Sequence, residues 1–492
     1  MRKLKSVIIA SVMLFTFVPM LNTTDTDSSS TKKVRGFNTD GSSFTGEVPV
    51  KPVSPIPSAY ADAKVDKIIN NGTDKYNIVL SIFGDGYTAA EQDKFTKDVA
   101  ATVKAIFSTY PYTEFKDRIN VYRIRTNSKE SGASDDYGKL PMKKVDNYFG
   151  SRFFYDGVTD RLLWCENCFK ADGILNYNGI ASDMTIMLVN SETYGGGGSD
   201  GFAVTSLNSW KDEIIVHEIA HALKLADEYW YSGFEAPNMT HKHNSNNPPW
   251  KPWLGYNGIG TFSFAEDSNW LHPNEQIEWT KCYEKRGKCQ YHKGNHCMME
   301  ALEYPFCEVC CSAMISTMSS MTNTPFFGYN SAYTEIHLPN IDDRILSYSF
   351  YGNDSITTLS VPGNVYEIGR FAFYNCSNLS SIRVPEYTEI IDSTVFYGSN
   401  KLTIYGYDDS PVIRHAKEYG HKYALIGDMD GDSIVDATDA SYVLELYSLL
   451  QTGQSVALSN DTAYRADFSG DAIVDAVDAS GILAYYAKIM TE

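Results

Sequence analysis

The residues most able to do chemistry lie in the stretch DEIIVHEIAHALKLADEYW, from Asp212 to Trp230. It contains H-E-x-x-H, with His217 and His221 four residues apart and Glu218 beside the first of them. Two histidines at this spacing share one face of a helix and can bind one zinc ion together. The glutamate would take a proton from a water molecule activated by the metal and pass it to a leaving amine. The pattern therefore predicts zinc-dependent hydrolysis of peptide bonds.

A catalytic zinc site takes three protein ligands and keeps a further position for water. The candidate for the third ligand is Asp227, six residues after His221. In an unbroken helix Asp227 would lie about 9 Å further along the axis, beyond reach of the metal. The helix is therefore expected to end soon after His221, with the chain folding back to bring Asp227 to the site. Glu228, with its longer side chain, is the alternative ligand.

Apolar runs before this helix predict the elements that must position it. Strands are expected at Asn77–Phe83, Ile119–Arg125 and Met184–Asn190. After the first strand, Thr88 and Glu91 have the spacing of a capping box and precede a helical apolar period. Strand, helix, strand, strand and site helix together predict an α/β catalytic domain.

The glycine-rich stretch TYGGGGSDGFAV precedes the site helix. It is predicted to form an edge strand whose open backbone pairs with an extended peptide substrate, because glycines allow a close approach. A mobile loop is the alternative. The candidates for stabilising a reaction oxyanion are Tyr229, Tyr291 and Tyr304. The remaining histidines of this region are expected to be surface or loop residues rather than ligands: His241, His243, His292 and His296.

The wider pattern H-E-x-x-H-x-x-x-x-x-D resembles that of metzincin-like metallopeptidases whose last ligand is aspartate. The stretches FGDGYTAAEQDKF, TNSKESGAS, NSETYGGGG, EAPNMT and CMMEALEYPFCEVC stand in the order seen in the IgA-peptidase-like family of bacterial zinc metallopeptidases. The resemblance spans about residues 75–320. It implies a secreted or surface endopeptidase with a metzincin-like α/β fold and one catalytic zinc.

The same resemblance implies one general base and three zinc ligands: Glu218, with His217, His221 and Asp227. Met298 or Met299, with Met299 favoured, is expected to form a methionine floor beneath the metal. Such peptidases usually have glycine three residues after the second histidine, where a left-handed residue makes the turn. This chain has Lys224 there, at a cost of about 1 kcal/mol. The expected substrates are extracellular proteins. Immunoglobulin A and other glycoproteins are candidates, but the resemblance does not imply immunoglobulin cleavage, and plant, mucin or microbial proteins are equally plausible.

Nine cysteines are present, eight in the central region and Cys376 apart from them. In an exported protein, disulfides that hold long loops are the expected use. A structural zinc shared by the two C-x-x-C pairs is the alternative. Those pairs are Cys165 with Cys168 and Cys307 with Cys310.

A repeat begins after residue 326, where Phe350, Phe373 and Phe396 recur every 23 residues. The unit AFYNCSNLSSIRVP combines an aromatic-led turn with a short apolar strand. A period in the low twenties is typical of leucine-rich solenoids, and this unit resembles the BspA-type repeats of bacterial surface proteins. About three repeats are evident. Adhesion or substrate capture and a rigid spacer are the two functional interpretations.

Two acidic loops follow, in DMDGDSIVDATD and DFSGDAIVDAVD. A twelve-residue calcium loop supplies oxygens at positions 1, 3, 5, 7, 9 and 12. In the first loop these positions are Asp428, Asp430, Asp432, the Ile434 carbonyl, Asp436 and Asp439. In the second they are Asp467, Ser469, Asp471, the Ile473 carbonyl, Asp475 and Asp478. The sequence therefore predicts two calcium ions.

An aspartate at the last position, and no helix entering the first loop, give these loops the pattern of a type I dockerin. The resemblance implies a small α-helical module that binds a cohesin on a cellulosome-like scaffold. It also implies recognition of the cohesin by the residues at loop positions 10 and 11: Ala437 and Thr438, and Ala476 and Val477.

The N-terminus, MRKLK followed by an apolar run, is typical of a secretory signal. The run is short for a membrane span, so an extracellular protein that is secreted, surface-bound or attached to the scaffold is expected. No A-x-A cleavage site follows the run at once, so an uncleaved anchor is the alternative. A net charge of −19 disfavours nucleic acid and anionic membranes as partners.

The sequence thus predicts a multidomain protein. Its expected parts are a signal peptide (1–21), a Ser/Thr/Pro-rich linker (22–60), the zinc metallopeptidase domain (61–325), leucine-rich repeats (326–426) and a dockerin (427–492). The predicted function is that of a secreted zinc endopeptidase held on a scaffold. The alternatives are a non-catalytic binding or adhesion component of that scaffold and a factor that trims scaffold components.

Overall fold

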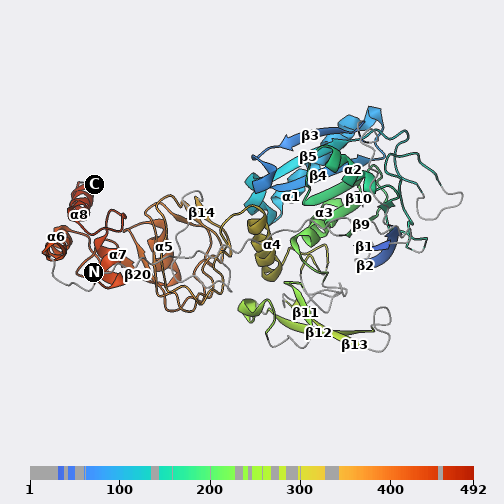
Figure 1. Cartoon of the computed structure of the whole chain (residues 1–492). Helices are drawn as coiled ribbons and strands as arrows, with labels where there is room; N and C mark the ends of the chain where they lie inside the picture. The colour runs from blue at the N-terminus through green and yellow to red at the C-terminus, as the bar shows by residue number, and fades with distance from the viewer. Residues whose placement is uncertain are drawn as a thin grey trace, which may run out of the picture.

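The computed structural model describes residues 31–37, 43–49, 60, 62–134, 143–157, 159–199, 201–227, 236–241, 247–256, 259–267, 276–283, 297–299, 301–326, 343–452 and 458–491. The predicted signal, residues 1–21, lies outside these ranges. In chain order, Figure 1 shows an α/β part, a coil of short strands and a helical C-terminal part. No helix in the described ranges is long and apolar enough to cross a membrane.

One eight-stranded sheet forms the centre of the α/β part, in the order β2-β1-β9-β10-β8-β4-β5-β3. The four central strands β10, β8, β4 and β5 are mutually parallel, whereas β9, β1, β2 and β3 pair antiparallel with their neighbours. The strands are β1 (Thr31–Phe37), β2 (Ser43–Pro49), β3 (Lys64–Ile69), β4 (Ile78–Asp85), β5 (Ile119–Arg125), β8 (Met184–Val189), β9 (Gly196–Ser199) and β10 (Phe202–Ser206).

The three strands predicted from apolar runs are confirmed as β4, β5 and β8. Every residue of β4 is buried, because a central strand of a parallel sheet is covered on both faces. Alternate residues of β4 face opposite sides. Leu80 and Ile82 join the apolar cluster that holds the site helix, and Val79 and Phe83 join a second cluster on the other face.

Helices cover both faces of the sheet. α1 (Gln92–Ser108), α3 (Lys211–Ala220) and α4 (Glu308–Met321) share one apolar cluster, and α2 (Phe169–Tyr177) packs in the other. The predicted capping box is confirmed, because the Thr88 backbone N–H donates to Glu91 at 2.9 Å. The mixed α/β class expected for this part of the chain is therefore confirmed.

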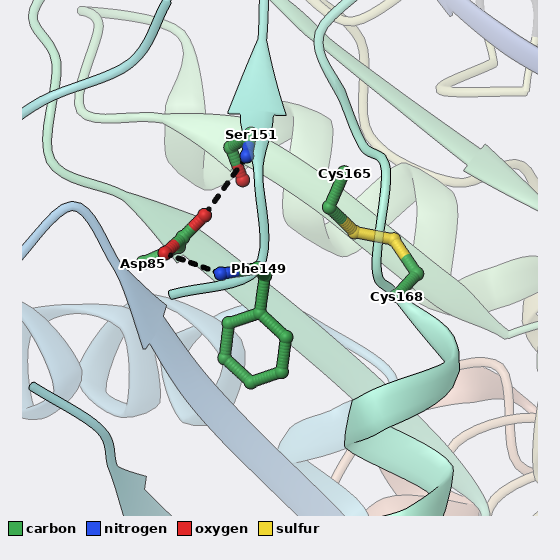
Figure 2. The surroundings of a disulfide bond; sticks show 5 residues. All are labelled: Asp85, Phe149, Ser151, Cys165 and Cys168. Carbon is green, nitrogen blue, oxygen red and sulfur yellow. Dashed lines mark hydrogen bonds between the residues drawn. A yellow bond between two sulfur atoms is a disulfide. The ribbon is translucent and has the colours of Figure 1, made fainter. Parts of the chain in front are cut away.

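A buried aspartate at the end of β4 holds the loop that packs beside the disulfide. Asp85 accepts hydrogen bonds from the backbone N–H groups of Phe149 and Ser151, both at 3.0 Å (Figure 2). Ser151 begins β6 (Ser151–Arg152), which pairs with β7 (Trp164–Cys165). These bonds compensate the carboxylate for the hydration that it loses on burial.

Cys165 and Cys168 form a disulfide (Figure 2). The alternative of a structural zinc shared by two C-x-x-C pairs is therefore wrong, since one pair is oxidised. Cys297, Cys307 and Cys310 are buried and bring their sulfur atoms within 4.8 Å of one another. Of these, the Cys297 and Cys310 sulfurs are 3.6 Å apart.

Part of the segment predicted as a linker forms regular structure. Within residues 22–60, Thr31–Phe37 and Ser43–Pro49 make the antiparallel strands β1 and β2 at one edge of the sheet. Composition alone predicted otherwise, because the abundant Ser, Thr and Pro of residues 22–60 are typical of linkers. β1 pairs with its neighbour β2 and, at one position, with β9, about 160 residues further along the chain.

A separate three-stranded sheet has the order β11-β13-β12, and Figure 1 shows it below the eight-stranded sheet. Its strands are β11 (Met239–His241), β12 (Gly260–Asp267) and β13 (Gln276–Tyr283).

The 23-residue repeat forms a solenoid. Phe350, Phe373 and Phe396 stack in a ladder with ring centroids 5.0 and 5.7 Å apart. Two narrow parallel sheets run along it, β14-β16-β18 and β15-β17-β19-β20. Their strands are β14 (Arg344–Ile345), β15 (Thr358–Ser360), β16 (Glu367–Ile368), β17 (Ser381–Arg383), β18 (Glu389–Ile390), β19 (Thr403–Gly406) and β20 (Lys422–Leu425), and α5 (Pro411–Tyr419) precedes the last. Successive turns repeat the same contacts, as expected of a leucine-rich solenoid.

The solenoid packs directly against the α/β part. The Trp253 ring stacks on Tyr374 with centroids 4.7 Å apart. Glu308 of α4 accepts hydrogen bonds from the Tyr348 hydroxyl and, at 2.8 Å, from Arg370. An apolar and ion-paired joint of this kind favours the spacer interpretation, because it holds the solenoid against the helix next to the site.

The C-terminal part consists of α6 (Ala437–Gln451), α7 (Asn460–Ala466) and α8 (Ala476–Ile489). Its core is continuous with that of the solenoid. Arg383, which is 5% exposed, donates to the Asp467 carbonyl at 2.8 Å, and the Tyr407 hydroxyl donates to the Phe468 carbonyl at 2.7 Å.

Candidate metal centre

The site helix ends where the chemistry requires it to end. α3 carries His217 and Glu218 and stops at Ala220, and a single 3-10 turn then runs from His221 to Leu223. Lys224 follows with φ +68°, in the left-handed region. The predicted reversal of the chain after His221 is thus confirmed.

The reversal brings Asp227 between the two histidines. Its Oδ1 atom lies 3.1 Å from His217 Nε2 and 3.2 Å from His221 Nε2. Ligands at zinc bond lengths of about 2.0–2.2 Å, placed at the corners of a tetrahedron, are about 3.3–3.5 Å apart. Both distances from Asp227 Oδ1 are therefore close to the spacing that a tetrahedral zinc ion imposes on its ligands.

Backbone carbonyls orient both imidazoles. His217 Nδ1 lies 2.9 Å from the Met298 carbonyl oxygen, and His221 Nδ1 lies 2.9 Å from that of Leu225. A carbonyl can only accept, so each imidazole donates from Nδ1 and its Nε2 atom faces Asp227. Metal-binding histidines are commonly held by this kind of outer hydrogen bond.

Glu218 lies beside these three atoms and further from them. Its Oε2 atom is 3.9 Å from His221 Nε2, against 3.2 Å for Asp227. The ligand atoms of His217, Glu218 and His221 also lie within 4.8 Å of one another. The shorter distances favour Asp227 as the ligand and leave Glu218 next to the metal position.

The buried histidines and carboxylates shift one another's pKa values. Burial by itself lowers the pKa of His221, but the carboxylates of Asp227 and Glu218 raise that pKa to about 9. Burial raises the pKa of Asp227, yet His221 and His217 hold it well below its usual value. A proton on His221 thus compensates the buried negative charge, and a divalent cation would take over that role and release the proton.

The donor set fits a zinc ion. His217 and Asp227 are fully buried, and Glu218 is 1% exposed. The Nε2 atom of His221 is buried and lies 3.2 Å from Asp227 Oδ1. Two imidazole nitrogens and a carboxylate oxygen are ligands that zinc prefers, and two buried carboxylates require a compensating cation.

Two supporting residues were not predicted. Met298 contributes the carbonyl that orients His217, whereas the sequence predicted only a side-chain role for Met298 or Met299. Met299 is fully buried in the same apolar cluster as α3. Asn238 donates to the Ala226 carbonyl at 2.7 Å and accepts from the Ala226 N–H at 3.0 Å, which holds the residue before Asp227. The sequence feature that could have pointed to Asn238 is its position in EAPNMT, one of the stretches that carry the resemblance to the IgA-peptidase-like family.

The glycine-rich stretch does form a strand, β9, directly over Glu218. A Cβ atom added to Gly198 would lie 1.9 Å from Glu218 Oε2, so any other residue there would displace the Glu218 carboxylate from this position. The prediction that β9 has an open edge is wrong, because β1 pairs with it at Arg35 and Gly198. The physical reason is that an unpaired strand edge readily takes another strand, and the chain supplies one.

Several predicted residues lie outside the described ranges: Glu228, Tyr229, Tyr291, His243, His292 and His296. Only the backbone of His241, in β11, is described. Tyr304 lies before α4, where its N–H donates to the Ala301 carbonyl at 3.3 Å.

The two acidic loops have the same internal hydrogen bonds. In the first, Asp428 accepts from the Gly431 N–H and Asp439 from the Asp436 N–H, both at 2.8 Å. In the second, Asp467 accepts from Gly470 and Asp478 from Asp475, also at 2.8 Å. The structure also gathers the carboxylates of Asp428, Asp430 and Asp439 within 4.8 Å. Backbone N–H groups thus position the first and last predicted ligands of each loop.

The remaining predicted loop residues are exposed or half-buried. They are Asp430, Asp432, Ile434, Asp436, Ser469, Asp471, Ile473 and Asp475. Ala437, Thr438, Ala476 and Val477 are also exposed, on the first turns of α6 and α8.

Lys224 offers a test of the turn. Replacing Lys224 by Gly is expected to raise the free energy of unfolding by about 1 kcal/mol, because glycine adopts a left-handed conformation without strain. Urea denaturation followed by tryptophan fluorescence measures the change. Lys94→Gly, within α1, is the matched control and should destabilise by about 1 kcal/mol. A loss of stability in Lys224→Gly would contradict the strained turn.

Comparison with known families supports two of the resemblances. Residues 67–277 match the family model described as IgA Peptidase M64. Residues 313–410 match that of the BspA type leucine rich repeat region, in 6 copies where the spaced phenylalanines indicate about three. Comparison with curated proteins gives no match. The chain thus joins a region similar to the IgA peptidase M64 family to a BspA-type leucine-rich repeat region.

Proposed function

We propose that this protein is an exported zinc-dependent endopeptidase that hydrolyses extracellular proteins. The observation that carries the proposal is the meeting of His217 Nε2, His221 Nε2 and Asp227 Oδ1 with Glu218 at their side. The similarity of residues 67–277 to a peptidase family supports it independently. The proposed substrates are extracellular proteins, with immunoglobulin A and other glycoproteins as candidates.

His217, His221 and Asp227 would hold the zinc ion. When bound, zinc would polarise the carbonyl of the scissile peptide bond and lower the pKa of a water molecule into the neutral range. Glu218 accepts the proton of the attacking water and donates it to the amine that leaves. Burial of Glu218 under Gly198 holds its carboxylate in one position. A fixed base of this kind needs little reorganisation during the reaction.

Met299 is proposed as the methionine floor, and Tyr229, Tyr291 and Tyr304 as candidates for stabilising the oxyanion. Metal content and cleavage of a diverse peptide library, measured on the same preparation, test the proposal. One zinc per chain, loss of cleavage on chelation and recovery on adding zinc are expected. Cleavage that survives complete removal of the metal would refute it.

We further propose that the C-terminal part is a type I dockerin that binds two calcium ions and a cohesin on a scaffold. The shared hydrogen-bond pattern of the two loops supports this proposal. Asp428, Asp439, Asp467 and Asp478, the first and last predicted ligands, are all buried. Buried carboxylates are stabilised by hydrogen bonds and by compensating positive charge; Arg465 supplies part of that charge to Asp428 at 3.3 Å, and calcium would supply more. Ala437, Thr438, Ala476 and Val477 are the proposed cohesin-contacting residues.

Calcium titration is expected to show two ions per chain. Asp428→Ala and Asp467→Ala should each remove one ion and weaken cohesin binding, because each substitution deletes the first ligand of one loop. Isothermal titration calorimetry measures both effects. Asp408→Ala, an exposed carboxylate outside the loops, is the control and should keep both ions. Two bound ions in the Asp428→Ala protein would count against the proposed loop.

A further inference from the structure

The N-terminal hairpin, formed by β1 and β2, lies at the edge of the sheet nearest the candidate metal centre. β1 pairs with β2 along its whole length, from Thr31 opposite Pro49 to Phe37 opposite Ser43. Its other side pairs antiparallel with β9, with Arg35 opposite Gly198. Figure 1 shows the hairpin beside β9.

β1 pairs with β9 at Gly198, the residue that contacts the proposed general base, Glu218. Gly198 is the glycine against which Glu218 packs. β9 has only two edges, and β10 takes the first through four paired positions, Phe202–Thr205 with Gly196–Ser199. On the second edge, Leu162 bridges Gly196 and β1 pairs with Gly198. A peptide that pairs with β9 beside Glu218 must therefore displace β1.

We propose that the N-terminal hairpin is an intramolecular inhibitor, which occupies the edge of β9 that an extended peptide substrate would use. The proposal rests on the peptidase function proposed above. The hairpin acts as a competing strand and needs no side chain in the metal centre, because the backbone pairing alone closes the edge.

The hairpin is separable from the fold that it covers. The region similar to the peptidase family begins at residue 67, after both of its strands. Without it, β9-β10-β8-β4-β5-β3 is still a continuous six-stranded sheet. The chain leaves β2 at one edge and enters β3 at the other. Release of the hairpin from β9, or its replacement by a substrate strand, would therefore leave the central strands paired.

The contact between β1 and β9 is small enough to be reversible. One register pair joins β1 to β9, against seven that join β1 to β2. Three of the four residues of β9 are glycines, which offer no side chains to fix a register. The tether raises the local concentration of the hairpin to the order of 1 mM. A segment that binds with a Kd of about 0.1 mM would then reduce activity about tenfold.

A cleavable full-length protein tests the proposal. A recognition sequence for a site-specific protease is placed between Pro49 and Tyr60, and the rate of peptide cleavage is measured before and after it is cut, at micromolar concentration. Cutting is expected to raise kcat/KM about tenfold, mainly by lowering KM. A synthetic peptide of residues 31–49 should restore competitive inhibition, and a scrambled peptide should not.

Hydrogen exchange gives a readout that does not depend on activity. In the Glu218→Gln protein, the amide of Gly198, which pairs with Arg35, is expected to lose protection when the hairpin is released. The amide of Gly196, which donates to the Arg161 carbonyl, should keep its protection and serves as the internal control. Arg35→Pro should raise kcat/KM without any cut, since proline disrupts strand pairing, and Arg35→Ala should not.

Two results would overturn the inference in different ways. Unchanged kcat/KM after proven release of the hairpin overturns it and leaves the peptidase function standing. No hydrolysis by the wild-type chain before or after release, with zinc bound, overturns both.

Discussion

Glu218→Gln is expected to lower kcat/KM for peptide hydrolysis by about 10³-fold, while one zinc ion per chain is retained. Gln has nearly the same shape as Glu and fits under Gly198, but it cannot accept the proton of the attacking water. His217, His221 and Asp227 are unaltered, so the metal stays. Steady-state cleavage of a peptide found in the library, with metal analysis of the same sample, measures both quantities.

A carboxylate on the same helix provides the control for this prediction. Asp212, on the first turn of α3, is partly exposed and pairs with Lys211. Asp212→Asn therefore removes the same charge from α3 at a distance from the metal centre and should keep full activity. If Glu218→Gln retained wild-type kcat/KM, its role as the general base would be disproved.

Asp227→Ala is expected to weaken zinc binding by more than about 100-fold, because it removes the only anionic ligand of the proposed three. Activity should fall with metal occupancy. The two imidazoles stay oriented by the Met298 and Leu225 carbonyls, so a weak two-histidine site should persist. Competition with a chromogenic chelator measures the affinity.

Glu228→Ala separates the two candidates for the third ligand. It is expected to bind zinc as tightly as the wild type, because the geometry brings Asp227 to 3.1 and 3.2 Å from the histidine nitrogens. The reverse pattern, with Asp227→Ala normal and Glu228→Ala impaired, would assign the third ligand to Glu228.

Much of the candidate site could be predicted because its signals are local. The spacing of His217 and His221 places both on one helical face, and the distance along the chain to Asp227 requires a reversal. The structure shows that reversal at Lys224, with φ +68°. The capping box of Thr88 and Glu91 was equally predictable, since three residues suffice to form it.

The sequence by itself determined the site helix, the central strands, the 23-residue ladder of phenylalanines and the paired pattern of the acidic loops, since each depends on spacing within one segment. Only the tertiary structure decided which backbone carbonyl orients His217, that Asn238 holds the residue before Asp227, and that β1 closes the edge of β9. These contacts join segments far apart in the chain through backbone groups, which every residue possesses. Such pairings cannot be predicted from residue types, because they depend on the path of the chain in space.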